Sequence, residues 1–320
     1  MKAAVVMQAG QMPVYSDVDE PAPAEGHAII DVEASALSHI TRGRASGTHY
    51  SSSARLPFVA GIDGVGRRRE DGKRVYFFAP KEPSGGLAER TVVAQSQCIE
   101  IPETLDPVIA AAMAIPGMSS WAALTERAHF ARGETVLIYG ATGASGRLAV
   151  QIAKHLGAAK VIATGRHPRT LSTLASVGAD YVLSLDQEES ALQRALEPHF
   201  HEGVDVVLDY LWGASALTLL TGAARSLPGG YPMRFVQIGS VGGATISLPG
   251  AALRASAIML MGSGIGSIPL ERLFNATREV LHAAIPSRFE IATQAVPLAE
   301  LATHWNESGS RLRTVFTMQG

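Results

Sequence analysis

The chain has 320 residues, of which 47% are hydrophobic and 18% are charged, and this length suggests about two domains of roughly 100–200 residues each. The composition excludes intrinsic disorder of the whole chain, which requires low hydrophobicity and high net charge. The formal net charge is −2. Because no broad positive field is available to hold a phosphate backbone, we expect no nucleic-acid partner.

Cysteine content and apolar stretches bear on the compartment. Cys98 is the only cysteine, which excludes an intrachain disulfide and fits a reducing compartment. The apolar stretch after Lys2 is shorter than the ~7–15 residues of a signal-peptide core. The longest weakly polar stretches, 108–118 and 255–268, contain Pro116 or several glycines and fall short of the ~18 residues of a spanning helix. We expect a cytoplasmic protein with no membrane partner.

Up to about residue 116, short apolar runs alternate with turn residues. The runs 3–6, 28–32, 74–78 and 89–93 are separated by glycine, proline and serine. Such a pattern predicts a β-rich, partly closed domain. The basic triplet 67–69 is followed at once by Glu70 and Asp71, so we interpret it as a solvated turn rather than an anion site.

From about residue 117 to 266, the pattern changes to buried strands that alternate with helices. We expect strands at 135–139, 161–164, 181–184, 204–208 and 235–238, helices at 147–156 and 168–177, and a sixth apolar run at 257–262. This alternation predicts an α/β fold with a doubly wound parallel sheet of Rossmann type. Residues 267–320 carry a helical pattern at 269–284 and a terminal strand at 313–317, and we expect this short segment to complete the first domain.

A glycine-rich turn joins the first of these strands to its helix. It reads Gly140-Ala141-Thr142-Gly143-Ala144-Ser145-Gly146. In a dinucleotide site, backbone amides of such a turn and the positive end of the helix hold the pyrophosphate. Gly143 and Gly146 suit the close approach and the helix packing, while Gly140 and Ala141 share the tight bend. A glycine turn made only for packing is the alternative.

The end of the second strand distinguishes NADPH from NADH. It reads Thr164-Gly165-Arg166-His167-Pro168-Arg169, without the acid that would accept hydrogen bonds from a free ribose 2′-hydroxyl. A guanidinium can pair with a 2′-phosphate through two hydrogen bonds. We therefore predict NADPH, with Arg166 as the main contact and Arg169 and Thr164 as helpers. The alternative is that the arginines belong to a solvated helix start.

Residues that follow the last strands are expected to border the cofactor, because ligands of such sheets bind at the carboxyl ends of the strands. These residues are Gly239, Ser240 and Ser263.

Four segments resemble those of the medium-chain dehydrogenase/reductase superfamily, specifically its zinc-independent quinone oxidoreductase-like branch. They are 56–66, 86–89, 117–124 and 133–137. The resemblance implies a GroES-like substrate domain at 1–116, completed by 267–320, and a Rossmann domain at 117–266. It places Ser119 where relatives have a threonine beside the nicotinamide ring, although Ser119 could instead cap the helix that follows.

The same resemblance argues against a catalytic metal. Zinc alcohol dehydrogenases of this superfamily place a cysteine where this chain has Ser38 and a histidine where it has Ile62. A catalytic zinc needs about three protein ligands, so we predict no metal. His199 and His201 could chelate as a His-x-His pair, but we expect them to be exposed histidines in a loop.

Without a metal, hydride transfer is easiest to a conjugated acceptor, because the negative charge spreads onto a distant oxygen. We predict an NADPH-dependent oxidoreductase that acts on a quinone or another conjugated (α,β-unsaturated) carbonyl. The resemblance places Tyr50 at the active-site cleft, as a hydrogen-bond or proton donor. It places Ser38 where many relatives have asparagine, near the acceptor or the nicotinamide. Either residue could be an ordinary loop residue.

Three alternatives stay open: an enoyl-thioester reductase, a non-catalytic NADPH-binding redox sensor, and zinc-dependent alcohol oxidation. In this superfamily the last Rossmann strand often pairs with its copy in a second subunit. The run 257–262 is apolar and has little charge to protect an exposed edge, so we predict a homodimer through this strand.

Overall fold

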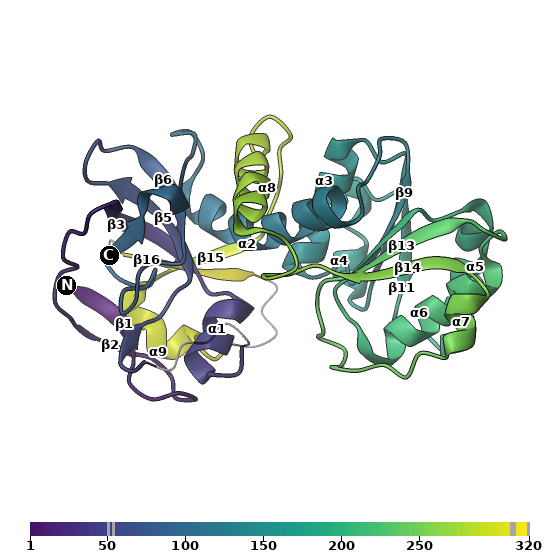
Figure 1. Cartoon of the computed structure of the whole chain (residues 1–320), viewed down its shortest axis with the longest axis horizontal. Helices are drawn as coiled ribbons and strands as arrows, with labels where there is room; N and C mark the ends of the chain where they lie inside the picture. Colours follow the sequence, from purple (N-terminus) through teal and green to yellow (C-terminus); the bar gives the residue numbers. More distant parts are fainter. Residues whose placement is uncertain (50–51, 53–54, 308–311, 319–320) are drawn as a thin grey trace. The chain divides into compact units, whose positions relative to one another are not determined.

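The computed structural model describes residues 1–49, 52, 55–307 and 312–318. The chain forms two compact units, Met1–Ile115 with Leu281–Gly320, and Pro116–Val280 (Figure 1). The division after the second unit falls inside helix α8 (Leu270–Ala283), later than the residue 267 that the sequence suggested.

The described part of the first unit contains two β-sheets. A seven-stranded mixed sheet has the order β15-β16-β3-β5-β6-β8, with β7 also paired to β3, and a three-stranded antiparallel sheet has the order β2-β1-β4. Residues of β3 alternate between more and less buried positions along most of its length, as a strand with one face on a core does. The strands are β1 (Lys2–Val6), β2 (Val14–Asp17), β3 (His27–Ala36), β4 (Phe58–Val59), β5 (Asp63–Arg68), β6 (Arg74–Phe78), β7 (Arg90–Ala94), β8 (Cys98–Glu100), β15 (Thr293–Pro297) and β16 (Arg313–Thr317).

The C-terminal segment completes the larger sheet, as predicted. Strand β16 pairs antiparallel with β3, with Val315 opposite Ala36, and parallel with β15. Two helices, α1 (His39–Ser46) and α9 (Leu301–His304), belong to the same unit. Leu298, Leu301 and Trp305, in and beside α9, are buried in one core cluster with Leu37 and Phe316. The end of the chain is therefore part of the first unit's core.

The second unit is built on a six-stranded parallel sheet with the order β11-β10-β9-β12-β13-β14 among its described strands. In chain order of the strands this is 3-2-1-4-5-6, the arrangement of a Rossmann fold. Figure 1 shows β13 and β14 side by side at one edge. The strands are β9 (Thr135–Tyr139), β10 (Lys160–Gly165), β11 (Tyr181–Ser184), β12 (Val206–Asp209), β13 (Pro232–Gln237) and β14 (Ala257–Gly262).

Helices connect these strands: α3 (Ala144–Leu156), α4 (Pro168–Leu171), α5 (Glu189–Glu202), α6 (Gly213–Ser226) and α7 (Gly250–Arg254). Apolar residues of α3 are buried on the sheet, and Gly157 (φ +97°) ends the helix in a left-handed cap. The helix predicted at 168–177 is broken instead. After α4 the chain makes turns and then a short 3₁₀ segment, Ala175–Val177, because serine and threonine hydroxyls there bond to nearby backbone carbonyls.

The prediction that His199 and His201 lie in a loop was wrong. Both lie on α5, where His199 is buried with 8% of its surface exposed. Its ring contacts Tyr181 edge-on, with the ring centroids 4.8 Å apart. Residues two positions apart on a helix do not share a face, so the helix keeps the two imidazoles from chelating one ion.

A long apolar helix was missed by the sequence analysis. Helix α2 (Pro107–Ala122) continues past Pro116 and runs into a π-helical turn, Ala123–Arg127. In the described chain, Pro107–Arg127 is the one helix long and apolar enough to cross a membrane, although 78% of its apolar window is buried inside the protein. The prediction that the stretch 108–118 is too short for a spanning helix was therefore wrong about the length of the helix that contains it. Such burial is common in core helices of globular proteins.

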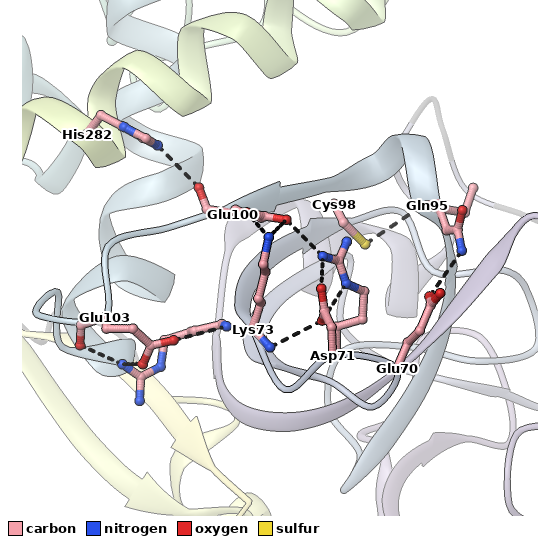
Figure 2. Close-up of polar contacts among 11 residues, drawn as sticks. Glu70, Asp71, Lys73, Gln95, Cys98, Glu100, Glu103 and His282 are labelled. Atoms are coloured by element: carbon pink, nitrogen blue, oxygen red, sulfur yellow. Dashed lines mark hydrogen bonds and ion pairs between the residues drawn. The ribbon is translucent and has the colours of Figure 1, made fainter.

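The basic triplet 67–69 is paired with acids. Arg68 lies 2.8 Å from Glu100, and Arg67 lies 2.9 Å from Glu103. Lys73 also contacts Glu100 at 3.0 Å, and the Glu100 carbonyl lies 3.2 Å from His282 Nε2 (Figure 2). This network joins the β5–β6 hairpin to β8 and to the last turn of α8, which is a structural use of the charges rather than an anion site.

Candidate functional site

The glycine-rich turn connects β9 to α3. Gly140 has φ +98°, which favours glycine. A Cβ on Gly146 would lie 2.4 Å from the Gly140 carbonyl oxygen, so only glycine lets α3 approach the strand this closely. A Cβ on Gly143 would meet nothing nearer than 3.8 Å, and no side chain caps α3. Gly143 and Ala144 are exposed, so the start of α3 presents free amides where an anion is favoured.

The carboxyl ends of the parallel strands lie along one edge of the sheet, and backbone hydrogen bonds join them in sequence. This chain of bonds joins the ends of five strands and brings together the predicted cofactor residues that follow four of them, β9, β10, β13 and β14. The bonds are Ala141 N to Thr164 O (2.6 Å), Tyr210 N to Tyr139 O (3.0 Å), Gly239 N to Asp209 O (3.1 Å) and Ser263 N to Gln237 O (2.9 Å).

Thr164 has a structural position. Its side chain is fully buried, and its hydroxyl accepts from Gly140 N at 3.2 Å and donates to Ile138 O at 3.3 Å. It therefore anchors the glycine-rich turn and does not face the 2′-phosphate as predicted. Gly165 is needed for the same packing, because a Cβ there would lie 2.2 Å from the Thr142 side chain.

Arg166 and Arg169 follow the end of β10 and are both exposed. Among the described residues neither guanidinium has an ion pair, and no acid stands between them in the sequence. Two cations without counter-charges, next to the end of the second strand, form a local positive patch suited to an anion.

The remaining predicted cofactor residues have different surroundings. Ser240 is exposed, and Ser263 is half-buried at the end of β14. Ser119 does not cap a following helix, as the alternative interpretation held, because α2 continues to Ala122. Its hydroxyl donates to Pro116 O at 2.9 Å, which leaves its oxygen lone pairs as the free polar function.

In the first unit, Ser38 acts as the N-cap of α1. Its oxygen accepts from Thr41 N at 3.0 Å, its hydroxyl donates to Thr41 Oγ1 at 3.0 Å, and only 2% of the residue is exposed. The structure thus uses Ser38 to begin a helix, a role that the sequence analysis did not assign. Tyr50, the predicted proton donor, lies outside the described residues.

The residues around Ser38 do not fit a catalytic zinc. Ile62 is 5% exposed and has no ligating atom, and the Ser38 hydroxyl is used within α1. In the part of the chain that the structure describes, no group of three or more His, Cys, Asp and Glu side chains could hold a metal ion.

A buried charged cluster in the first unit escaped the sequence analysis. Asp63 is completely buried, and its Oδ2 accepts from the Tyr76 hydroxyl at 3.2 Å, while Oδ1 has no hydrogen-bond partner among the described residues. Burial raises the pKa of Asp63 to about 7, although Arg313 and the Tyr76 hydrogen bond oppose this shift. Nε and Nη2 of Arg313 are also buried without a partner. The sequence offered one signal of this cluster, which is that Asp63 lies between Gly61 and Gly64 in an otherwise apolar segment.

Because of the Asp63 carboxyl, we expect the free energy of unfolding to decrease as pH rises from about 4 to about 7. Above pH 3.8 the unfolded chain has lost this proton, whereas the folded chain keeps it up to about pH 7, so raising the pH favours unfolding, by about 4 kcal/mol at most. Asp63→Asn should make the slope of the free energy of unfolding against pH shallower. Asp209, whose burial raises its pKa to about 6, contributes to the remaining slope in the same direction. Burial lowers the pKa values of His39, His49 and His199, which contribute in the opposite direction.

Asp71→Asn is the matched control. Hydrogen bonds from Arg68 are the main cause that lowers the pKa of Asp71 to about 2, so its stabilisation is complete above pH 3.8 and is lost only at lower pH. The control should keep the wild-type slope between pH 4 and 7. Urea titrations at several pH values measure both slopes, and an unchanged slope in Asp63→Asn would contradict the assignment.

Two cavities among the described residues, one in each unit, have no predicted site residue in their linings. One, of about 40 Å³, lies beside α1 and the Arg44–Glu82 ion pair, and has room for little more than water. The other, of about 290 Å³, lies between α5 and α6 and has Leu196 and Phe200 among its lining residues.

Known proteins resemble the chain in sequence and in fold. The family described as "Zinc-binding dehydrogenase" matches residues 144–283. The chain is 28% identical to the "Probable NADPH-dependent quinone reductase tdiC" of Emericella nidulans, over 93% of this chain and 94% of that protein. It is 33% identical to the "Quinone oxidoreductase" of Rattus norvegicus, over 62% of this chain and 61% of that protein, so the match spans less than two thirds of that relative.

Among solved structures, the quinone oxidoreductase from Thermus thermophilus, studied alone and in complex with NADPH, superposes with a TM-score of 0.81. The alignment covers 99% of this chain and all of that one at 24% sequence identity. At this identity the likeness establishes the fold, with its parallel Rossmann sheet and separate mixed sheet.

Proposed function

The chain belongs to the medium-chain dehydrogenase/reductase superfamily, in its quinone oxidoreductase-like branch, and on that premise we propose that it is an NADPH-dependent oxidoreductase. The observation that carries the proposal is the carboxyl edge of the Rossmann sheet. There, an uncapped and exposed start of α3 follows the glycine-rich turn. Arg166 and Arg169, which have no ion pair among the described residues, follow the neighbouring strand β10.

These residues fit the phosphates of NADPH. The amides at the start of α3 and its positive end bind the pyrophosphate, and Gly146 keeps the helix close enough to the strand for this. Arg166, with Arg169 beside it, pairs with the 2′-phosphate. Gly239, Ser240, Ser263 and Ser119 border the rest of the dinucleotide. When bound, NADPH supplies a hydride.

The acceptor is a quinone or an α,β-unsaturated carbonyl. Ser38 and Ile62 offer no zinc ligand, which favours a reaction that needs no Lewis acid to stabilise an alkoxide. A conjugated acceptor avoids this need by spreading its negative charge. Tyr50 donates a hydrogen bond or a proton to the acceptor oxygen. Ser38 holds the start of α1, and its oxygen can accept one further hydrogen bond.

The protein acts as a homodimer in the cytoplasm. Strand β14 is an edge of the described sheet, and Met259 and Leu260 on it are 44% and 40% exposed. An exposed apolar edge strand invites pairing with a second copy. A light-scattering mass equal to one chain, 33.6 kDa, at micromolar concentration would contradict the dimer.

The enzymatic test is oxidation of NADPH by EDTA-treated protein, with NADH as the control cofactor and a panel of quinones, enones and an enoyl thioester. We expect turnover of a quinone or an enone with NADPH. Turnover of the thioester alone would favour an enoyl-thioester reductase, and NADPH binding without any turnover would favour a redox sensor. Activity that EDTA abolishes and zinc restores would overturn the metal-free mechanism. In the same assay, Tyr50→Phe should lower kcat/KM.

A further inference from the structure

A buried polar contact lies beneath the glycine-rich turn, at the end of β12. Tyr210 directly follows this strand and is 8% exposed. Its hydroxyl oxygen lies 2.7 Å from Oγ of Ser120, a completely buried residue of α2. Ser120 Oγ also lies 3.1 Å from the Ser145 carbonyl and 2.9 Å from the Pro116 carbonyl. Ser120 therefore lies where α2, the first turn of α3 and the end of β12 meet.

The chemistry of these groups fixes the direction of the hydrogen bonds. Carbonyl oxygens only accept, and a serine hydroxyl has one hydrogen to donate. If Ser120 donated to Tyr210, the carbonyl oxygens of Pro116 and Ser145 would both face the Ser120 oxygen with no hydrogen between them. The arrangement that satisfies the most groups has Tyr210 donating to Ser120, while the single hydroxyl hydrogen of Ser120 is shared between the carbonyls of Pro116 and Ser145. The Tyr210 hydroxyl thus orients a bond to the first turn of α3.

The rest of Tyr210 contacts other parts of the same edge. Its backbone N–H donates to Tyr139 O at 3.0 Å, directly before the glycine-rich turn. A Cβ on Gly239 would lie 2.5 Å from the Tyr210 carbonyl oxygen, and a Cβ on Gly140 would lie 3.5 Å from Tyr210 Cβ. One residue therefore packs against both the glycine-rich turn and the segment after β13.

We propose that Tyr210 is a positioning residue of the dinucleotide site, which holds the start of α3 through Ser120 and sets its place relative to Gly140 and Gly239. The inference deepens the proposed function and rests on it. Tyr210 touches no dinucleotide in this role. It acts by keeping in register the amides that bind the pyrophosphate, because binding groups held in place lose less entropy when the ligand arrives.

Tyr210→Phe tests this, because it removes only the hydroxyl. We expect the Kd for NADPH, measured by fluorescence titration without acceptor, to rise about three- to tenfold, the range of one buried neutral hydrogen bond. We also expect faster hydrogen exchange of the backbone amides of residues 141–147 in the protein without cofactor. Ser120→Ala should produce a similar change, and the double variant should not add the two effects, because both residues belong to one chain of hydrogen bonds.

Tyr139→Phe is the matched control. Tyr139 is also a buried tyrosine, and its hydroxyl donates to the Ser215 carbonyl on α6 at 3.2 Å. Loss of the Tyr139 hydroxyl should lower the melting temperature about as much as Tyr210→Phe does. It should change neither the Kd for NADPH nor the hydrogen exchange of the backbone amides of residues 141–147. If the two variants match in both measurements, the positioning role is overturned. If the wild-type protein binds no NADPH, the proposed function fails, and the exchange comparison alone decides whether Tyr210 orders the turn.

Discussion

Gly146→Ala should weaken NADPH binding about 10- to 100-fold. The new Cβ would lie 2.4 Å from the Gly140 carbonyl and 2.7 Å from Ala141 Cα, and both of these are backbone atoms that no rotamer change can move. The start of α3 must therefore move away from β9, and such overpacking costs about 1–3 kcal/mol. The displaced amides would lose their place at the pyrophosphate. Titration of the dinucleotide and the melting temperature should both report the loss.

Gly222→Ala separates this effect from the general consequence of adding a methyl group to a helix. Gly222 lies within α6, and a Cβ there meets nothing within 4 Å. This variant should gain about 0.5–1 kcal/mol of stability from helix propensity and bind NADPH as the wild type does. If Gly146→Ala binds NADPH with unchanged Kd, the turn is a packing feature only.

The second large effect is expected from Arg166→Ala. Loss of charge-assisted hydrogen bonds to a 2′-phosphate costs about 1.5–3 kcal/mol, which corresponds to roughly a 10- to 150-fold higher Kd for NADPH. NADH has no such phosphate, so its Kd should change little. Because the guanidinium has no ion pair among the described residues, its removal should leave the folded state as stable as before.

Arg194→Ala provides the control for net charge. Arg194 is an exposed arginine of α5, in the same unit and also without an ion pair in the described chain. Its removal lowers the net charge by the same amount and should affect the Kd of NADPH and NADH little and equally. Equal losses of both dinucleotides in Arg166→Ala would contradict a role at the 2′-phosphate.

The local sequence pattern was sufficient to predict two kinds of element: strands marked by an apolar run, and a turn whose backbone conformation requires glycine. The strands at 135–139, 181–184, 257–262 and 313–317 lie where the apolar runs predicted them, because short runs of apolar and β-branched residues bounded by turn residues favour strands. The glycine-rich turn was equally visible, because Gly140 and Gly146 meet steric demands that other residues cannot meet. The helix at 168–177 failed because side-chain hydroxyls compete locally for the backbone, which the apolar spacing does not reveal.

The sequence alone determined the Rossmann sheet, the place of its glycine-rich turn and the missing acid after the second strand. These features depend on residues close together in the chain, and the physical demands on them are local. Only the tertiary structure decided the environment of single polar groups. It buried Thr164 beneath the turn, made Ser38 a helix cap, buried Asp63 in contact with Tyr76 and joined Ser120 to Tyr210. The Ser38 cap depends on Thr41, three residues away, but the other environments depend on residues distant in sequence. No local pattern could therefore specify that Thr164, Asp63 and Ser120 would lose their contact with water.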